Sequence, residues 1–184
     1  MVGKKNIVFG FLYLVLTAAL GPYMVVKLLP ETDAAAAAKQ EKVGRLQTLA
    51  SNDFEEDLEP LSADQIARAN TEAILAINRQ LNAAAPVDSI KGGPHAHGNL
   101  EALLNIAAGV VLGLIALPVL WKQVISWLFI AGALLHSGML YLLNFGQAWA
   151  AKLLVLGPWL VLLALLAIGL AAAVGFRGEW VRDD

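Results

Sequence analysis

The residues of this chain that could do chemistry gather in one short stretch, residues 92–105. It holds His95 and His97, two of the three histidines of the protein, followed by Glu101 and Asn105 four residues apart. In an extended chain His95 and His97 point the same way and can grip one metal ion, whereas on a helix they diverge. The stretch therefore predicts a metal or cofactor site, and the alternative is that polar residues simply fill the turn into the next helix.

A second pattern continues from Glu101 and Asn105 in steps of four through Gly109 and Gly113. The spacing of the two glycines lets another helix approach closely, so we expect this face to meet protein rather than lipid. An intramembrane carboxylate indicates a functional site. The competing interpretation is that Glu101 lies in the first helical turn, where the macrodipole favours an acid.

The third histidine, His136, lies in another apolar stretch with Tyr141 five residues later. If the two helices are antiparallel, Tyr141, Glu101 and Asn105 reach one layer and His136 lies about one turn deeper. Five residues correspond to roughly 140° around a helix, so we expect His136 and Tyr141 to have separate roles. His136 would complete a metal-ligating set with His95 and His97, although a hydrogen bond between helices would also satisfy it.

The elements that must position these residues are apolar helices. Hydrophobic residues make up 58% of the 184-residue chain and charged residues only 15%, against roughly a quarter charged in an ordinary globular domain. A helix needs about 20 apolar residues to span a bilayer. These features predict an all-α, integral membrane four-helix bundle in which Lys122 alone separates the second and third spans. The expected spans are residues 7–26, 102–121, 123–145 and 153–176.

The flanking charges predict the orientation of the bundle. Lys4 and Lys5 precede the first span, and Arg177 and Arg182 follow the last one. The positive-inside rule therefore places both termini in the cytoplasm, and we expect a bacterial inner membrane. Residues 31–98 would then form an extracytoplasmic helical loop between spans one and two, which divides the chain into segments 1–30, 31–98 and 99–184.

The loop carries most of the charges of the chain, with eleven acids and six bases in residues 31–94. We expect a first helix capped at Thr32 or Asp33, and an acidic break over residues 53–59. Ser62 and Gln65 form a capping-box pattern that begins a second helix. The apolar stripe of that helix would cover the bundle or a neighbouring subunit, or else close over a site as a lid.

The rest of the composition excludes several classes of chemistry. The chain contains no cysteine, which rules out disulfides, thiolate nucleophiles and covalent attachment of haem. The net charge of −2 gives no indication of nucleic-acid binding. We therefore expect the lipid bilayer and other protein subunits as the partners of this chain.

The order of motifs over about residues 90–150 resembles a known family. Ala96-His97 precedes the second span, Leu103-Leu104-Asn105 opens it, and Tyr141 lies near the outer end of the third. This order is similar to that of the small four-span membrane enzymes typified by styrene oxide isomerase and hydroxylaminobenzene mutase.

The resemblance implies a trimer that binds haem b and rearranges a small apolar substrate such as an epoxide. It implies that His97 is the axial ligand, with His95 beside it, and that the iron acts as a Lewis acid. Asn105 and Tyr141 would polarise the opening ring, and we expect Glu101 to belong to the same catalytic group. Imidazole ligation and one open coordination position suit this chemistry.

Two other functions also fit the sequence. The chain could be a non-catalytic subunit or assembly factor of a larger membrane complex that binds haem or copper through His95, His97 and His136. It could also be a structural bundle without any cofactor. A haem absorption band would separate the ligand-binding functions from the structural one.

Overall fold

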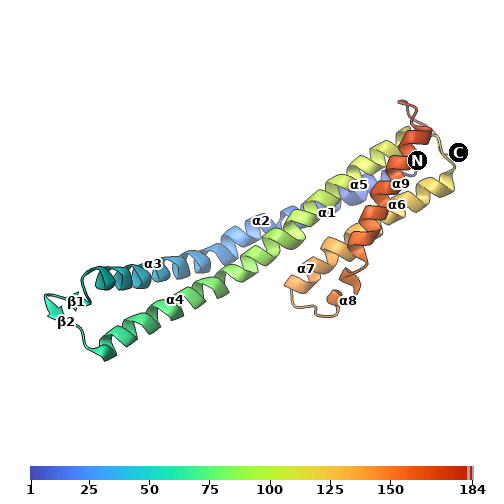
Figure 1. Cartoon of the computed structure of the whole chain (residues 1–184). Coiled ribbons are helices and arrows are strands. Elements are labelled where there is room, and N and C mark those ends of the chain that lie inside the picture. Colours follow the sequence, from blue (N-terminus) through green and yellow to red (C-terminus); the bar gives the residue numbers. More distant parts are fainter. Residues whose placement is uncertain (182, 184) are drawn as a thin grey trace. The chain divides into compact units, whose positions relative to one another are not determined.

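A computed structural model of the protein describes residues 1–181 and 183, and its architecture is helical (Figure 1). Within these residues, four helical segments are long and apolar enough to cross a membrane, and each overlaps one of the stretches predicted from the sequence, although the second segment ends at Leu114 rather than at residue 121. The all-α class and the four apolar helices are thus confirmed. The four segments are Lys4–Ser51, Ala63–Leu114, Val119–Asn144 and Ala150–Gly175.

Each long segment is built from shorter elements. The first contains α1 (Lys4–Ala18), α2 (Leu20–Tyr23), the π-helical turn η1 (Met24–Leu28) and α3 (Leu29–Ser51). The short strands β1 (Glu55–Glu56) and β2 (Glu59–Pro60) join it to α4 (Ala63–Ile90), η2 (Lys91–His95) and α5 (Ala96–Leu114). The third segment contains α6 (Val119–Ala133), η3 (Leu134–Gly138) and α7 (Met139–Asn144), and the fourth contains α8 (Ala150–Leu154) and α9 (Gly157–Gly175).

The chain folds as two compact units. We call Met1–Pro22 with Ser89–Asp184 the four-helix unit, because α1, α5, α6 and α9 form it, and Tyr23–Asp88 the hairpin unit.

In the hairpin unit, α3 and α4 are antiparallel helices linked by the predicted acidic break. The capping box is confirmed, because Gln65 Oε1 accepts from the Ser62 backbone at 2.8 Å and Ser62 Oγ accepts from the Gln65 backbone at 3.3 Å. The predicted cap at Thr32 or Asp33 is wrong, since the helix continues through both residues. Thr32 Oγ1 donates instead to the carbonyls of Leu28 and Ala83, at 3.1 and 3.0 Å.

In the four-helix unit, small residues allow α1 and α5 to approach closely. A Cβ atom added to Gly109 would lie 2.6 Å from the Gly3 carbonyl oxygen, and one added to Gly10 would lie 2.6 Å from that of Ala102. Only glycine fits at such distances between two backbones. The prediction that the glycine stripe of α5 faces protein is confirmed.

The connection between α5 and α6 differs from the sequence prediction. Residues 115–118 form it, and the Ala116 backbone donates to the Gly175 carbonyl at 2.8 Å. Pro118 is the N-cap residue of α6, directly before its first helical residue Val119. Lys122 therefore lies inside α6 rather than between two helices, and the prediction that it separates them is wrong.

Candidate functional site

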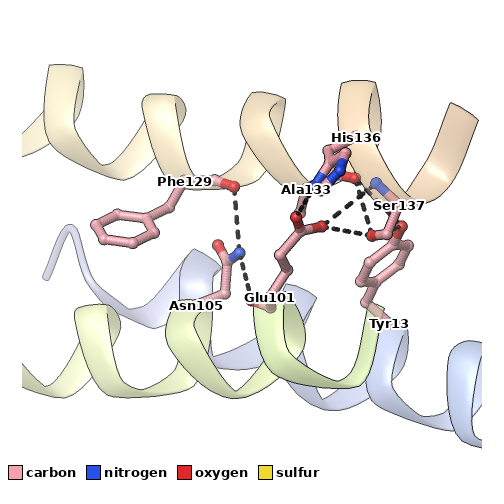
Figure 2. A network of polar contacts seen from close by, with 7 residues as sticks. All are labelled: Tyr13, Glu101, Asn105, Phe129, Ala133, His136 and Ser137. Atoms are coloured by element: carbon pink, nitrogen blue, oxygen red, sulfur yellow. Dashed lines mark hydrogen bonds and ion pairs between the residues drawn. The ribbon is translucent and has the colours of Figure 1, made fainter. Parts of the chain in front are cut away.

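A buried carboxylate, Glu101 of α5, forms the centre of the polar network in Figure 2. Its Oε1 lies 2.5 Å from His136 Nδ1, and its Oε2 accepts a 2.5 Å hydrogen bond from Ser137 Oγ. The Ser137 backbone N–H approaches the same oxygen at 3.4 Å. Glu101 thus receives its partners from the neighbouring segment η3, which supplies both His136 and Ser137.

Tyr13 extends this network onto a third helix. Its hydroxyl lies 2.8 Å from Ser137 Oγ and 3.3 Å from the Ala133 carbonyl oxygen, so α1 also contributes to the cluster (Figure 2). Because Ser137 donates to Glu101, its oxygen is free to accept from Tyr13. His136 and Ser137 lie in the π-helical turn η3, and such turns are frequent at functional sites.

The position of Glu101 tests one of the two interpretations made from the sequence. Helix α5 begins at Ala96 and has no acidic residue in its first turn. The first-turn interpretation is therefore wrong. The carboxylate is compensated by side chains and a backbone N–H of η3, as an intramembrane acid that faces protein would be.

Asn105 lies one turn further along α5, in a separate buried layer. Its Nδ2 donates to the carbonyls of Glu101 and Phe129 at 3.0 and 3.2 Å, and its Oδ1 accepts from Asn6 Nδ2 at 3.0 Å. Asn6 also bonds to both the backbone and the hydroxyl of Ser126. Every polar atom of the Asn105 amide therefore has a protein partner.

The sequence analysis missed Asn6 and Ser126. Asn6 belongs to a buried stripe of α1, because residues 6, 10, 13 and 17 are all buried on that helix. The steps of four, three and four residues were the signal that could have found Asn6. No comparable periodic signal marks Ser126, whose role comes from Asn6 on another helix.

The three histidines lie in two different environments. The exposed His97 ring contacts the His136 ring, with the centroids 4.7 Å apart and the planes tilted by 51°. His95 instead approaches the Thr17 carbonyl oxygen, 3.0 Å from its Nδ1. His95 and His97 both lie on helical backbone, where side chains two positions apart point in different directions.

The predicted metal site of His95, His97 and His136 is therefore not assembled. Within residues 1–181 and 183, no group of three or more His, Cys, Asp or Glu side chains is placed to hold a metal ion. The structure brings together His97, His136 and Glu101 instead. In this group Glu101 bonds to one nitrogen of His136. It would therefore orient a histidine rather than bind a metal ion itself.

Tyr141 takes a separate place, on α7. Its ring stacks on Phe145 with the centroids 4.9 Å apart, whereas the tyrosine that joins the Glu101 network is Tyr13. The phenol expected from the resemblance is thus replaced in this network by one from α1.

A second buried charged group lies at the other end of the four-helix unit. Lys122 Nζ donates to Asp183 Oδ1 at 2.7 Å, and the Val2 backbone N–H donates to Asp183 Oδ2 at 2.6 Å. Burial alone would raise the pKa of Asp183, but these two hydrogen bonds and the charge of Lys122 together lower it below its ordinary value. This pair joins α6 to residues beyond α9.

Comparison of the chain with protein families, curated proteins and solved structures finds no match. The resemblance to the isomerase family stays a prediction.

Proposed function

We propose that this chain is an integral membrane protein that binds haem b, or a transition metal ion such as copper, at His97. The observation that carries the proposal is the 2.5 Å contact between Glu101 and His136 beside the His97 ring. The carboxylate orients His136, which packs against the His97 ring, and a carboxylate that fixes the orientation of a histidine is typical of the surroundings of metal sites.

The residues fit a haem at His97 better than one between two histidines. The His97 and His136 rings are in contact at 4.7 Å, which leaves no room for a porphyrin plane between them. His97 is exposed on α5, and imidazole is a common axial ligand of haem iron. A small ion could instead take one nitrogen from each ring, since imidazole also suits copper and zinc.

The surroundings of His97 support a membrane site that a second molecule covers. Leu100 and Leu103 on the same helix are more than half exposed, as expected for side chains that meet lipid or another subunit. A polar ring on such a helix is unfavourable in hydrocarbon unless a cofactor or protein partner satisfies it. The proposal therefore includes a homo-oligomer, a trimer by resemblance, or a place in a larger membrane complex.

The proposed topology follows the flanking charges rather than the site. Both termini lie in the cytoplasm of a bacterium, the four helices cross its inner membrane, and residues 31–98 are extracytoplasmic. In this topology His97 and Glu101 lie in the outer half of the bundle.

An absorption spectrum of the full chain, purified in mild detergent after expression with added haem precursor or copper, tests the proposal. We expect either a haem absorption band or copper in stoichiometric amount. His97→Ala should abolish this ligand, and His136→Ala should shift its absorption band. His95→Ala is the matched control and should leave the ligand in place, because His95 contacts Thr17 instead. Protein that contains neither haem nor metal under these conditions, or loss of ligand in the His95 variant alone, would contradict the proposal.

For a protein with haem or a metal ion at His97, a non-catalytic role as an accessory subunit or assembly factor is the better-supported function. Asn105 is 1% exposed and its amide is fully bonded, while the Tyr141 ring stacks on Phe145. The Asn105 amide is therefore not free to polarise a substrate at the His97 ring. Copurification of further subunits at fixed stoichiometry would support this role.

Isomerase activity is the second candidate, and the exposed His97 ring favours it. A haem held by His97 would supply Lewis-acid chemistry to an oxygen atom of the substrate. Glu101 would hold His136 in a fixed orientation beside the His97 ring. Turnover of an aryl epoxide by the haem-loaded protein, lost in His97→Ala, would establish this candidate over the accessory role.

A further inference from the structure

A groove of about 650 Å³ opens on the four-helix unit between the beginning of α1 and the beginning of α6. Apolar side chains form most of its wall, including Val8 and Trp127, which are 48% and 57% exposed. The groove therefore opens away from the bundle, toward the side that lipid would occupy. Phe9 in its wall stacks on Tyr13, with the ring centroids 5.1 Å apart, so the groove lies next to the Glu101 network, but none of the three histidines lines it.

Lys5 is the charged group in the wall of this groove. Its Nζ donates to Gln123 Oε1 and lies 4.3 Å from the centroid of the Trp127 ring. Both partners are neutral, and in the part of the chain that the structure describes no carboxylate lies within ion-pair distance of Lys5. Lys4, which also lines the groove, adds a second positive charge without an ion-pair partner among the same residues.

Lys5 differs in this respect from Lys122, which lies at the same end of the unit. Lys122 is buried and bonds to the Asp183 carboxylate at 2.7 Å. Lys5 is only half-buried, and its ammonium is held at the edge of an apolar groove by an amide and an aromatic face. Such an arrangement orients the cation and leaves its charge available for an anion from outside the chain.

We infer that this groove binds an anionic phospholipid, with an acyl chain along Val8 and Trp127 and the phosphate at Lys5 Nζ. The apolar wall matches a hydrocarbon chain, and the uncompensated ammonium matches the phosphate. Basic pockets between membrane helices are known to bind anionic headgroups on the cytoplasmic side, where the flanking charges place Lys5. Binding needs no haem or metal at His97.

Quenching of tryptophan fluorescence by brominated lipids tests this site in the full chain. The purified protein is titrated in mild detergent with brominated phosphatidylglycerol or brominated phosphatidylcholine, and Trp127→Phe identifies the part of the signal from Trp127. We expect phosphatidylglycerol to be preferred. Lys5→Gln should reduce that preference about fivefold, the factor that about 1 kcal/mol per basic residue near a membrane surface corresponds to.

Two control variants and a competition with inorganic phosphate test the specificity of this result. Lys5→Arg retains the charge and should retain the preference, and Lys152→Gln removes an exposed lysine of α8 and should leave it unchanged. Inorganic phosphate at millimolar concentration should not displace the lipid, because it lacks the acyl chain. Equal quenching by both lipids, equal losses in Lys5→Gln and Lys152→Gln, or displacement by phosphate would overturn the inference.

Discussion

The two units of this protein hold their charges in opposite ways. In the hairpin unit, Arg68 and Asp64 form an ion pair across one helical turn, with side chains 75% and 72% exposed. In the four-helix unit, the side chains of Lys122 and Asp183 are 1% and 4% exposed. Water solvates the first pair whether or not it forms, whereas each partner of the second pair depends on the other.

This difference shows what kind of residue to expect at a functional position in each unit. An exposed pair contributes little and can be replaced freely, while a buried charged group is retained only where it has partners or a role. Glu101 and His136 belong to the second kind. The hydrogen bonds from His136 and Ser137 satisfy the Glu101 carboxylate. The His97 ring forms the exposed edge of the site.

Breaking the pair of Lys122 and Asp183 should have the largest effect. We expect Lys122→Met to lower the free energy of unfolding by about 3–5 kcal/mol, because it removes the cation that bonds directly to the buried Asp183 carboxylate and leaves only the more distant amino terminus of Met1, 3.7 Å away. Unfolding by heat or by SDS in detergent micelles measures this. The double variant Lys122→Met/Asp183→Leu should recover most of the loss, since an apolar pair of similar volume replaces a buried ion pair well. A loss below about 1 kcal/mol in the single variant would show that water reaches Asp183.

Acid should break the same pair without any substitution. The folded protein lowers the pKa of Asp183 below its value of 3.8 in the unfolded chain, so the pair contributes fully above that pH. The contribution is lost as the pH falls through the lower folded value. We expect the difference in melting temperature between the wild type and Asp183→Asn to be constant from pH 7 to about pH 5 and to shrink below about pH 4. A difference that grows in acid would contradict the assigned pKa direction.

Removing the charge of Glu101 should have a smaller effect than Lys122→Met. Glu101→Gln keeps the shape of the side chain and weakens the bonds from His136 and Ser137, so we expect a loss of about 1–3 kcal/mol in the free energy of unfolding. Glu179→Gln is the matched control, because the same change at an exposed acid should be neutral. In the ligand-loaded protein the Glu101 variant should also shift the absorption band, through His136. A variant as stable as the wild type would show that the bonds from His136 and Ser137 do not contribute to folding.

Much of this contrast between the units could be predicted from the sequence. Lipid requires long uncharged helices, so hydropathy alone predicts the four apolar segments. The steps of four from Glu101 to Gly113 predict a face that meets protein, because small and polar residues on one stripe suit close helix contact.

What the sequence could not predict is which groups on different helices meet. The periodicity of α1 and α6, each taken alone, does not reveal that Asn6 bonds to Ser126, and Lys122 finds its partner 61 residues away at Asp183. A local sequence signal can also fit two different backbone structures. Thr32 has the side chain of a helix cap, yet its hydroxyl bonds to the preceding turn and the helix continues.

The smallest effect should come from the exposed pair of the hairpin unit. We expect Arg68→Ala to change the free energy of unfolding by at most about 0.5 kcal/mol, because exposed pairs four residues apart on a helix contribute about 0.3–0.5 kcal/mol. The melting temperature of the full chain at 0.1 M and 1 M salt measures this, and high salt should remove the remaining difference by screening. A loss above about 1 kcal/mol would mean that α4 is covered by a second chain or subunit in the assembled protein, since only burial makes such a pair important.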